Sequence, residues 1–187
     1  PKRFENAQKL SSINYNQAIE LAYYGASVIH PKTIQPLKSK NISLYVNSFI
    51  NMDVEGTVVN NQAENLNQAC YIVKEKQTQL SFSTKNYSFI AEENLSYIFE
   101  AFAKHKVRIN VMQNSAISFS ACCDTKENKI EDLMNELKEY FIIESIPECV
   151  LLTVYNSTQN EDLPSIYQNK TVLLKQMLGH TIQMVIK

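Results

Sequence analysis

The sequence contains only three glycines in 187 residues, at positions 25, 56 and 179. They lie too far apart to form a glycine-rich phosphate loop or the G-x-G-x-x-G turn of a dinucleotide-binding fold. Folds that depend on such a loop are therefore excluded, and any nucleotide would find its main phosphate contacts outside this sequence. Gly25 instead fits the end of a helix, and Gly179 fits a turn between two strands.

The composition argues against several kinds of partner. Eighteen basic and 19 acidic residues give a formal net charge of -1, so we expect no nucleic acid and no membrane among the partners. No apolar run approaches the roughly 20 residues that cross a bilayer. The first ten residues lack the apolar core of a signal peptide. The four cysteines form no C-x-x-C pair, so we predict reduced thiols, no metal site and a cytoplasmic protein.

Residues 13–40 are predicted to be helical. Asn14, with Gln17 three residues later, forms a variant of the capping box that starts a helix. Pro31 suits the first position of a short second helix, whereas Pro36 argues against that helix being regular.

A strand and a linker are expected next. Residues 42–49 alternate apolar and polar side chains, which is typical of a strand. The segment 51–67 is polar and rich in Asn and Gln, so we interpret it as a linker. The first domain is therefore predicted to span residues 1–62.

The middle of the chain has the pattern of a complete α+β domain. An amphipathic helix is predicted where apolar residues recur at spacings of three and four from Ala91 to Phe102. The predicted elements are a strand at 80–83, a helix at 88–106, strands at 107–111 and 117–121, a helix at 128–141 and a strand at 142–146. This order is βαββαβ, which predicts a ferredoxin-like domain over residues 66–148.

A shorter unit is predicted for residues 149–187. Its expected order is βαββ, with strands at 150–155, 171–177 and 181–186 and a brief helix at 161–167. About 38 residues cannot bury a core alone, so this unit should pack on its neighbour or on a second chain.

The sequence resembles the C-terminal part of the aspartate kinases. The most specific match is ELAYYGASVIHPKTI at Glu20–Ile34, and further matches include Asn6-Ala7, Pro36 and Gly56-Thr57. NVMQNSAISFSACC at Asn110–Cys123 is similar to the regulatory part of the same family. The resemblance implies a helical remnant of an amino-acid kinase domain, one ACT domain and a second, abbreviated ACT domain.

The resemblance also implies the activity of the parent protein. Aspartate kinases use ATP and Mg²⁺ to phosphorylate the side-chain carboxylate of L-aspartate, the entry step to lysine, threonine and methionine synthesis. No catalytic residue of the family falls within this sequence, so we expect the chain alone to be inactive and to need an upstream kinase domain. Lys2, Ser27 and Val28 match an edge of the family's nucleotide site, although Ser27 stands where a lysine is usual.

The ACT resemblance implies a binding site for a small amino-acid effector. A helix N-terminus supplies N–H groups for a carboxylate, and the following strand supplies acceptors. The matching positions are Ser88, Phe89, Ala91, Asn94, Ile109, Asn110, Asn114 and Ser115.

Threonine or lysine is the expected effector, and threonine is favoured. Lysine-sensing relatives have an acidic residue where this chain has Asn110, and a buried ammonium group needs a carboxylate. We expect Asn110→Ala to weaken threonine binding several-fold with little change in the thermal midpoint. We also expect a homodimer through the ACT region. The alternative is a dimerisation module that binds no effector.

Overall fold

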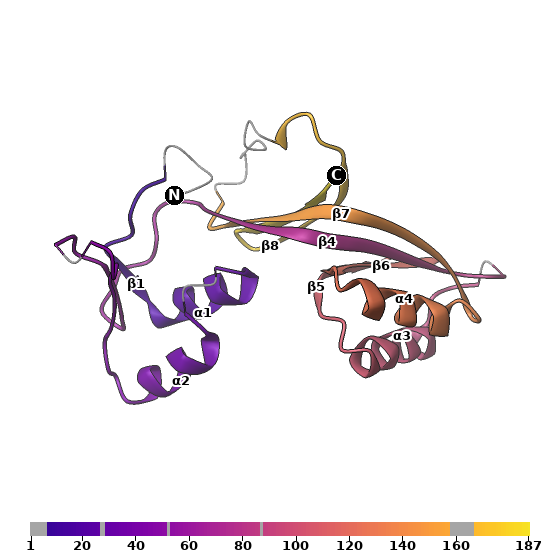
Figure 1. Cartoon of the computed structure of the whole chain (residues 1–187), viewed down its shortest axis with the longest axis horizontal. Helices are drawn as coiled ribbons and strands as arrows, with labels where there is room; N and C mark the ends of the chain where they lie inside the picture. The colour runs from indigo at the N-terminus through magenta and orange to yellow at the C-terminus, as the bar shows by residue number, and fades with distance from the viewer. Residues whose placement is uncertain (1–6, 27–28, 52, 87, 158–166) are drawn as a thin grey trace. The chain divides into compact units, whose positions relative to one another are not determined.

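The computed structural model describes residues 7–26, 29–51, 53–86, 88–157 and 167–187. The chain divides into two compact units, residues 1–72 and residues 73–187. Figure 1 shows the helices and strands of both units.

Two short helices in the first unit follow the local signals of the sequence. Helix α1, Tyr15–Tyr24, starts with the predicted capping box: the Gln17 N–H donates to Asn14 Oδ1 at 3.0 Å, and the Asn14 N–H donates to Gln17 Oε1 at 3.2 Å. Gly25 ends the helix with φ 118°, a left-handed conformation that glycine adopts without strain.

Helix α2, Pro31–Ser39, has a proline at its first position and continues through Pro36. Irregularity at Pro36 was predicted and is not found. Proline removes one backbone hydrogen bond, but Ile34 is completely buried, and its packing helps to hold this short helix in place.

A three-stranded sheet completes the first unit. Its order is β1-β3-β2, with β1 (Ser12–Asn14) parallel and β2 (Leu44–Val46) antiparallel to β3 (Thr57–Asn60). The prediction of a linker at 51–67 is therefore wrong for residues 57–60, which form strand β3. Strand β3 is only four residues long with polar flanks, yet its Val59 is completely buried. Gly56 precedes it where a Cβ atom would collide with the Val46 carbonyl oxygen.

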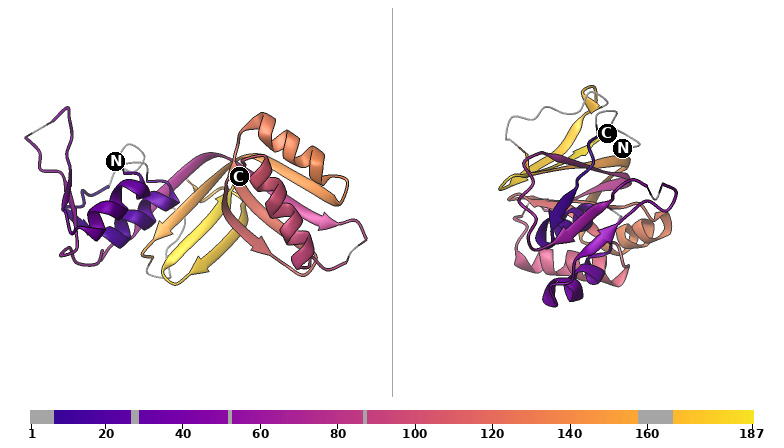
Figure 2. Two further views of the ribbon diagram at one scale, coloured as in Figure 1. Left: turned by 90° about the horizontal axis from the view of Figure 1, so that it is seen from below. Right: turned by 90° about the vertical axis from the view of Figure 1, so that its left-hand side faces the viewer.

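The second unit is a six-stranded sheet with two helices on it (Figure 2). The strand order is β5-β6-β4-β7-β9-β8, and the pairs β5/β6, β4/β6, β7/β9 and β8/β9 are antiparallel. The strands are β4 (Cys70–Thr84), β5 (Ile109–Asn114), β6 (Ser118–Asp124), β7 (Phe141–Tyr155), β8 (Val172–Leu178) and β9 (Thr181–Ile186). The helices are α3 (Glu92–Lys104) and α4 (Glu127–Leu137).

Apolar side chains are buried on both faces of this sheet. On the helical face, Phe82 of β4 contacts Phe102 of α3, with ring centroids 5.9 Å apart, and Leu133 of α4 is completely buried in the same core. On the other face, Cys122 and Leu151 belong to a smaller core. The mixed α+β class predicted from the sequence is confirmed.

Two expected strands form a single strand in the structure. Residues 142–146 and 150–155 both belong to β7, which runs for 15 residues beside β4, also 15 residues long. The predicted domain boundary at 148/149 lies inside this strand. Strand β9 has the predicted bounds, and residues 161–166 of the predicted brief helix lie outside the described residues.

Candidate functional site

The eight predicted effector positions form two groups in the structure. Ile109 and Asn110 lie at the start of β5, whereas Asn114 lies at its end and Ser115 follows in the turn to β6. The segment before α3 lies beside that turn, because the Ile90 N–H donates to the Ala116 carbonyl oxygen at 2.9 Å. Six of the eight positions are therefore near the end of β5, and two are at its start.

The helix at the first group begins later than predicted. Helix α3 starts at Glu92, so its N-cap is Ala91 rather than Ser88. Ser88 is held in the preceding loop, where its carbonyl oxygen accepts from Thr84 Oγ1 at 2.7 Å. The Ala91 N–H donates to Asn94 Oδ1 at 3.0 Å. The backbone N–H groups of the first turn remain as donors for an anionic group.

The turn that faces this helix end is closed by its own hydroxyl group. The Ser118 N–H donates to Ser115 Oγ at 3.1 Å, and the Ser115 N–H donates to the Ser118 carbonyl oxygen at 2.8 Å. Ser88, Phe89, Ala91, Asn114 and Ser115 are all exposed. We call this group of predicted positions, with Asn94, the open end of β5.

Asn110 belongs to a polar network at the other end of the strand. Its side-chain N–H groups donate to Gln77 Oε1 at 2.7 Å and to Asp124 Oδ1 at 2.8 Å, and its Oδ1 accepts from the Lys74 ammonium at 2.7 Å. The register of β5 against β6 shifts between Ile109 and Val111. Asn110 was predicted to be available to a ligand, but in the structure its amide is engaged on both sides.

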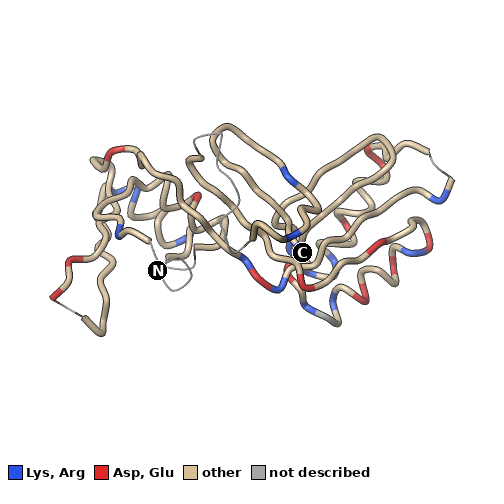
Figure 3. The backbone as a smooth tube through the Cα atoms, turned by 90° about the horizontal axis from the view of Figure 1, so that it is seen from above, with Lys and Arg blue, Asp and Glu red and all other residues tan. Residues whose placement is uncertain are grey.

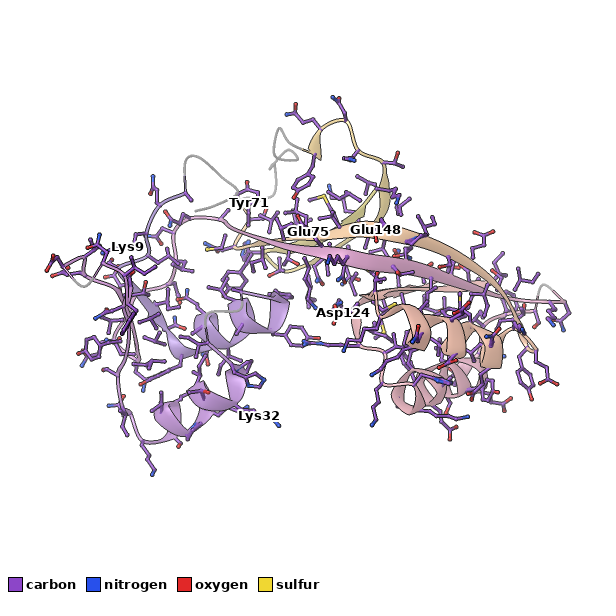
Figure 4. The ribbon with its side chains drawn as sticks, viewed as in Figure 1. Lys9, Lys32, Tyr71, Glu75, Asp124 and Glu148 are labelled. Atoms are coloured by element: carbon purple, nitrogen blue, oxygen red, sulfur yellow. The ribbon has the colours of Figure 1, made fainter. Side chains whose placement is uncertain are left out.

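Asp124 is the centre of this network, and the sequence analysis missed it. Its Oδ1 accepts from Lys74 at 2.8 Å and from Gln77 at 3.2 Å as well as from Asn110. Figure 4 labels Asp124. The signal in the sequence was a charged residue at the end of an otherwise uncharged strand, but its partners are up to 50 positions away. We call Lys74, Gln77, Asn110 and Asp124 the closed end of β5.

Hydrogen bonding decides the charge state of Asp124. Burial raises the pKa of this carboxyl group, but hydrogen bonds from Lys74, Asn110 and Gln77 outweigh burial and hold the pKa below its ordinary value of 3.8. The carboxylate is therefore ionised near neutral pH and already neutralised by the Lys74 ammonium. Gln77 is itself almost completely buried, which keeps the network close to the apolar core.

The predicted nucleotide-edge residues Lys2, Ser27 and Val28 lie outside the described residues. Near them in the sequence, the first unit has a mainly apolar cavity of about 480 Å³. Its lining includes Ala7, Leu10, Leu21, Ala26, Ile29 and Val59. Among the described residues of this lining, Lys9 has the only charged side chain, so these residues offer little to a phosphate group.

All four cysteines are free thiols; Cys122, Cys123 and Cys149 are buried, and Cys70 is half-buried. Burial raises the pKa of Cys123 to about 12 and raises the pKa of Cys122 further, so neither forms a reactive thiolate near neutral pH. No cluster of three His, Cys, Asp or Glu residues suited to a metal was found among the described residues. In that same part of the chain, no helix is both long and apolar enough to cross a membrane.

Comparisons with known proteins support one family. Residues 1–48 match the amino acid kinase family. The chain is 22% identical to aspartokinase 2, chloroplastic, of Arabidopsis thaliana, over 99% of this chain and 36% of the relative. It is 30% identical to the aspartokinase of Bacillus sp. (strain MGA3), over 78% of this chain and 37% of the relative. The chain thus spans little more than a third of the length of these relatives.

The fold agrees with the sequence comparison. A crystal structure of Escherichia coli aspartokinase III in complex with lysine and aspartate matches with a TM-score of 0.79 and 21% identity, over 99% of this chain and 44% of that chain. This match shows the fold across both units of the chain. In sequence and in fold, the chain therefore corresponds to the C-terminal region of the aspartokinases.

Proposed function

We propose that the chain is the amino-acid-sensing region of an aspartokinase, and that the whole protein uses ATP and Mg²⁺ to phosphorylate L-aspartate. The main support is the similarity to aspartokinases along nearly the whole chain. The open end of β5 adds a chemical reason, because it presents the first-turn N–H groups of α3 beside a polar turn.

The regulatory part is proposed to contain an ACT domain of ferredoxin-like topology. The segment from β4 to β7 has the element order βαββαβ, and its strands are arranged β5-β6-β4-β7. This arrangement supports an ACT domain at about residues 66–148. Residues 149–187 then form the abbreviated second ACT unit, which shares the long strand β7 with the first.

An effector amino acid is proposed to bind at the open end of β5. Its carboxylate would accept from the backbone N–H groups at the start of α3, where the helix dipole also favours an anion. Asn94, Asn114 and Ser115 would offer polar groups to the rest of the ligand. Binding there need not break the hydrogen bonds of the closed end, because among the described residues those bonds join only Lys74, Gln77, Asn110 and Asp124 to one another.

Threonine is proposed as a better effector than lysine. Glu92 and Glu93 at the start of α3 are exposed to solvent, and Asp124 beside Asn110 is already paired with the Lys74 ammonium at 2.8 Å. A lysine effector would need another carboxylate for its ε-ammonium group, whereas a small hydroxyl group needs none. Lysine is the competing candidate for the effector, because the structure of E. coli aspartokinase III was determined in complex with lysine and aspartate.

A homodimer through the ACT region is proposed because apolar side chains around α3 and β5 are exposed. The exposed fractions are 74% for Phe89, 48% for Met112 and 48% for Ile117. Strand β5 pairs only with β6 in the described sheet, so its other edge offers backbone groups to a second chain. The alternative function is an ACT-type dimerisation module without an effector, and the same exposed surface supports it.

The chain alone is proposed to lack kinase activity, with Lys2, Ser27 and Val28 as remnants of a nucleotide site that an upstream kinase domain completes. A cytoplasmic location also stays a proposal. The name of the plant relative places that protein in the chloroplast.

Calorimetric titration of the chain with threonine, lysine and methionine tests the proposed function. We expect saturable binding of threonine and weaker or no binding of lysine. Tight lysine binding without a threonine response would contradict the preference. No binding of any of the three, with a dimer mass in light scattering, would favour the dimerisation module.

A further inference from the structure

A polar cavity lies in the second unit and shares no residue with the open end of β5. It has a volume of about 560 Å³ and is formed by β4, the β6–α4 connection, the start of α4 and β7. The residues that line it are Lys76, Thr125, Lys126, Asn128, Lys129 and Glu148. None of them was a predicted site residue, and the proposed effector site uses none of them.

The backbone around this cavity has an unusual conformation on two adjacent strands. Lys76 of β4 has φ 54° and Glu148 of β7 has φ 56°, values that non-glycine residues adopt rarely. Strands β4 and β7 are neighbours in the sheet, and Figure 4 labels Glu148 on β7. The Thr125 N–H donates to the Lys76 carbonyl oxygen at 2.9 Å, which fixes the start of the α4 connection to β4.

The described residues that line this cavity carry a net positive charge. Three lysines and one glutamate line it, and no ion pair forms between Glu148 and Lys76, Lys126 or Lys129 in the part of the chain that the structure describes. The adjacent Asp124 does not offset this charge, because Lys74 pairs with it. Figure 3 shows acidic and basic positions interspersed along the chain, so this grouping is local.

The start of α4 adds donors to the same place. Its N-cap is Lys126, which makes no side-chain capping bond. The Lys129 N–H donates to the Lys126 carbonyl oxygen at 2.8 Å, but the backbone N–H groups of residues 127 and 128 and the helix dipole favour an anion at this end of an 11-residue helix.

We propose that this cavity binds a small multiply charged oxyanion of the phosphate class. Ammonium groups and backbone N–H groups bind phosphate oxygens strongly, and a volume of about 560 Å³ is within the range of small-molecule sites. The cavity is open and Lys76, Lys126 and Asn128 are exposed, so the affinity is modest and a dianion binds better than a monoanion. An anion bound there would join β4, α4 and β7.

Titration of the chain with inorganic phosphate and pyrophosphate, followed by ³¹P NMR at constant ionic strength in KCl, tests this site. We expect saturable binding, with pyrophosphate tighter than phosphate. Lys129→Gln and Lys76→Asn should each weaken binding about 3- to 10-fold. Asparagine is chosen at position 76 because it tolerates a left-handed conformation. Glu148→Gln should tighten binding about twofold, since it removes the one carboxylate among the described residues of the lining.

Lys170→Gln is the matched control, because it removes an exposed lysine outside the cavity. It should leave both affinities unchanged. The proposal is overturned if neither anion binds more tightly than chloride, or if Lys170→Gln weakens binding as much as Lys129→Gln. The titrations with amino acids report on the open end of β5, so either site can fail without the other.

Discussion

The two ends of β5 carry the same residue type in opposite states. Asn114 is exposed at the end of the strand, and it makes no side-chain hydrogen bond with another described residue. Asn110, four residues earlier, donates two hydrogen bonds and accepts one, and Asp124 and Lys74 are both among its partners. The comparison teaches that residue type and family position do not decide whether a side chain is available to a ligand.

The difference arises from what each end faces. The closed end lies over buried Gln77, close to the apolar core, so its polar groups must satisfy one another. The open end lies in solvent beside the start of α3, where backbone donors are still available. Stability should therefore depend on the closed end, and ligand binding on the open end.

The largest expected effect is that of Asp124→Ala. This substitution removes the acceptor of Lys74, Asn110 and Gln77 together, and we expect a loss of about 2 kcal/mol in the free energy of unfolding of the second unit. Thermal and urea unfolding followed by circular dichroism would measure it. Asn114→Ala is the matched control and should change stability by less than about 0.5 kcal/mol. Equal effects of the two substitutions would remove the distinction between the ends.

Asn110→Ala should have the next largest effect, about 1 kcal/mol of stability. The structure here revises the expectation from the sequence, which was weaker threonine binding at an unchanged thermal midpoint. Because the Asn110 amide is engaged by Gln77, Asp124 and Lys74, we now expect a lower midpoint and threonine affinity within about twofold of the parent chain. Calorimetric titration of Asn110→Ala with threonine measures the affinity, and thermal unfolding of the same variant measures the midpoint, so the two expectations can be told apart. A several-fold loss of affinity at an unchanged midpoint would restore the earlier expectation.

The stability difference between the parent chain and Asp124→Asn should depend on pH. The pKa of Asp124 is lowered in the folded chain from 3.8, so its contribution is present above pH 3.8 and is lost as pH falls through the folded pKa. The difference should therefore be largest near pH 6 and shrink below pH 3.8. Asp132→Asn, at an exposed position of α4, is the control. Its stability should differ little from that of the parent chain both near pH 6 and below pH 3.8. A difference that stays constant with pH would mean that Lys74 does not act through the Asp124 charge.

The smallest effect is expected at the open end, from Ser115→Ala. The Ser115 hydroxyl accepts from the Ser118 N–H at 3.1 Å in an exposed turn, and its loss should cost about 0.5 kcal/mol because water replaces the bond. Effector affinity should fall more than stability does, since the turn faces the start of α3. If stability fell as much as with Asp124→Ala, the open end would also be a structural network.

Local signals in the sequence were sufficient where an element depends on its own residues. The Asn14–Gln17 capping box and the Gly25 stop of α1 were predicted and are confirmed, because a cap is made within four residues. The strand predicted after the turn at Gly179 has the expected bounds, Thr181–Ile186. The predicted start of α3 at Ser88 was wrong, although serine is a common N-cap residue. The helix starts at Glu92, and the Ala91 N–H donates to Asn94 Oδ1.

Long-range pairing explains the rest. Strand β3 was missed because four residues between polar segments carry almost no periodic signal, and pairing with β1 and β2 decides their conformation. Strand β7 was divided in two at Pro147 and Glu148, although its second half is held by pairing with β9. At the candidate site, the sequence named Asn110 but not Asp124, Lys74 or Gln77, since those contacts join residues 14 to 50 positions apart.

Hydrogen exchange measured with and without saturating threonine tests the central claim most directly. If the chain is an amino-acid-sensing region that binds its effector at the open end of β5, exchange should slow at the amides of residues 92–95 and 114–118. The amides of Lys74, Gln77 and Asp124 should change little. Saturated binding that slows exchange only at those three residues, while the start of α3 is unaffected, would contradict the account.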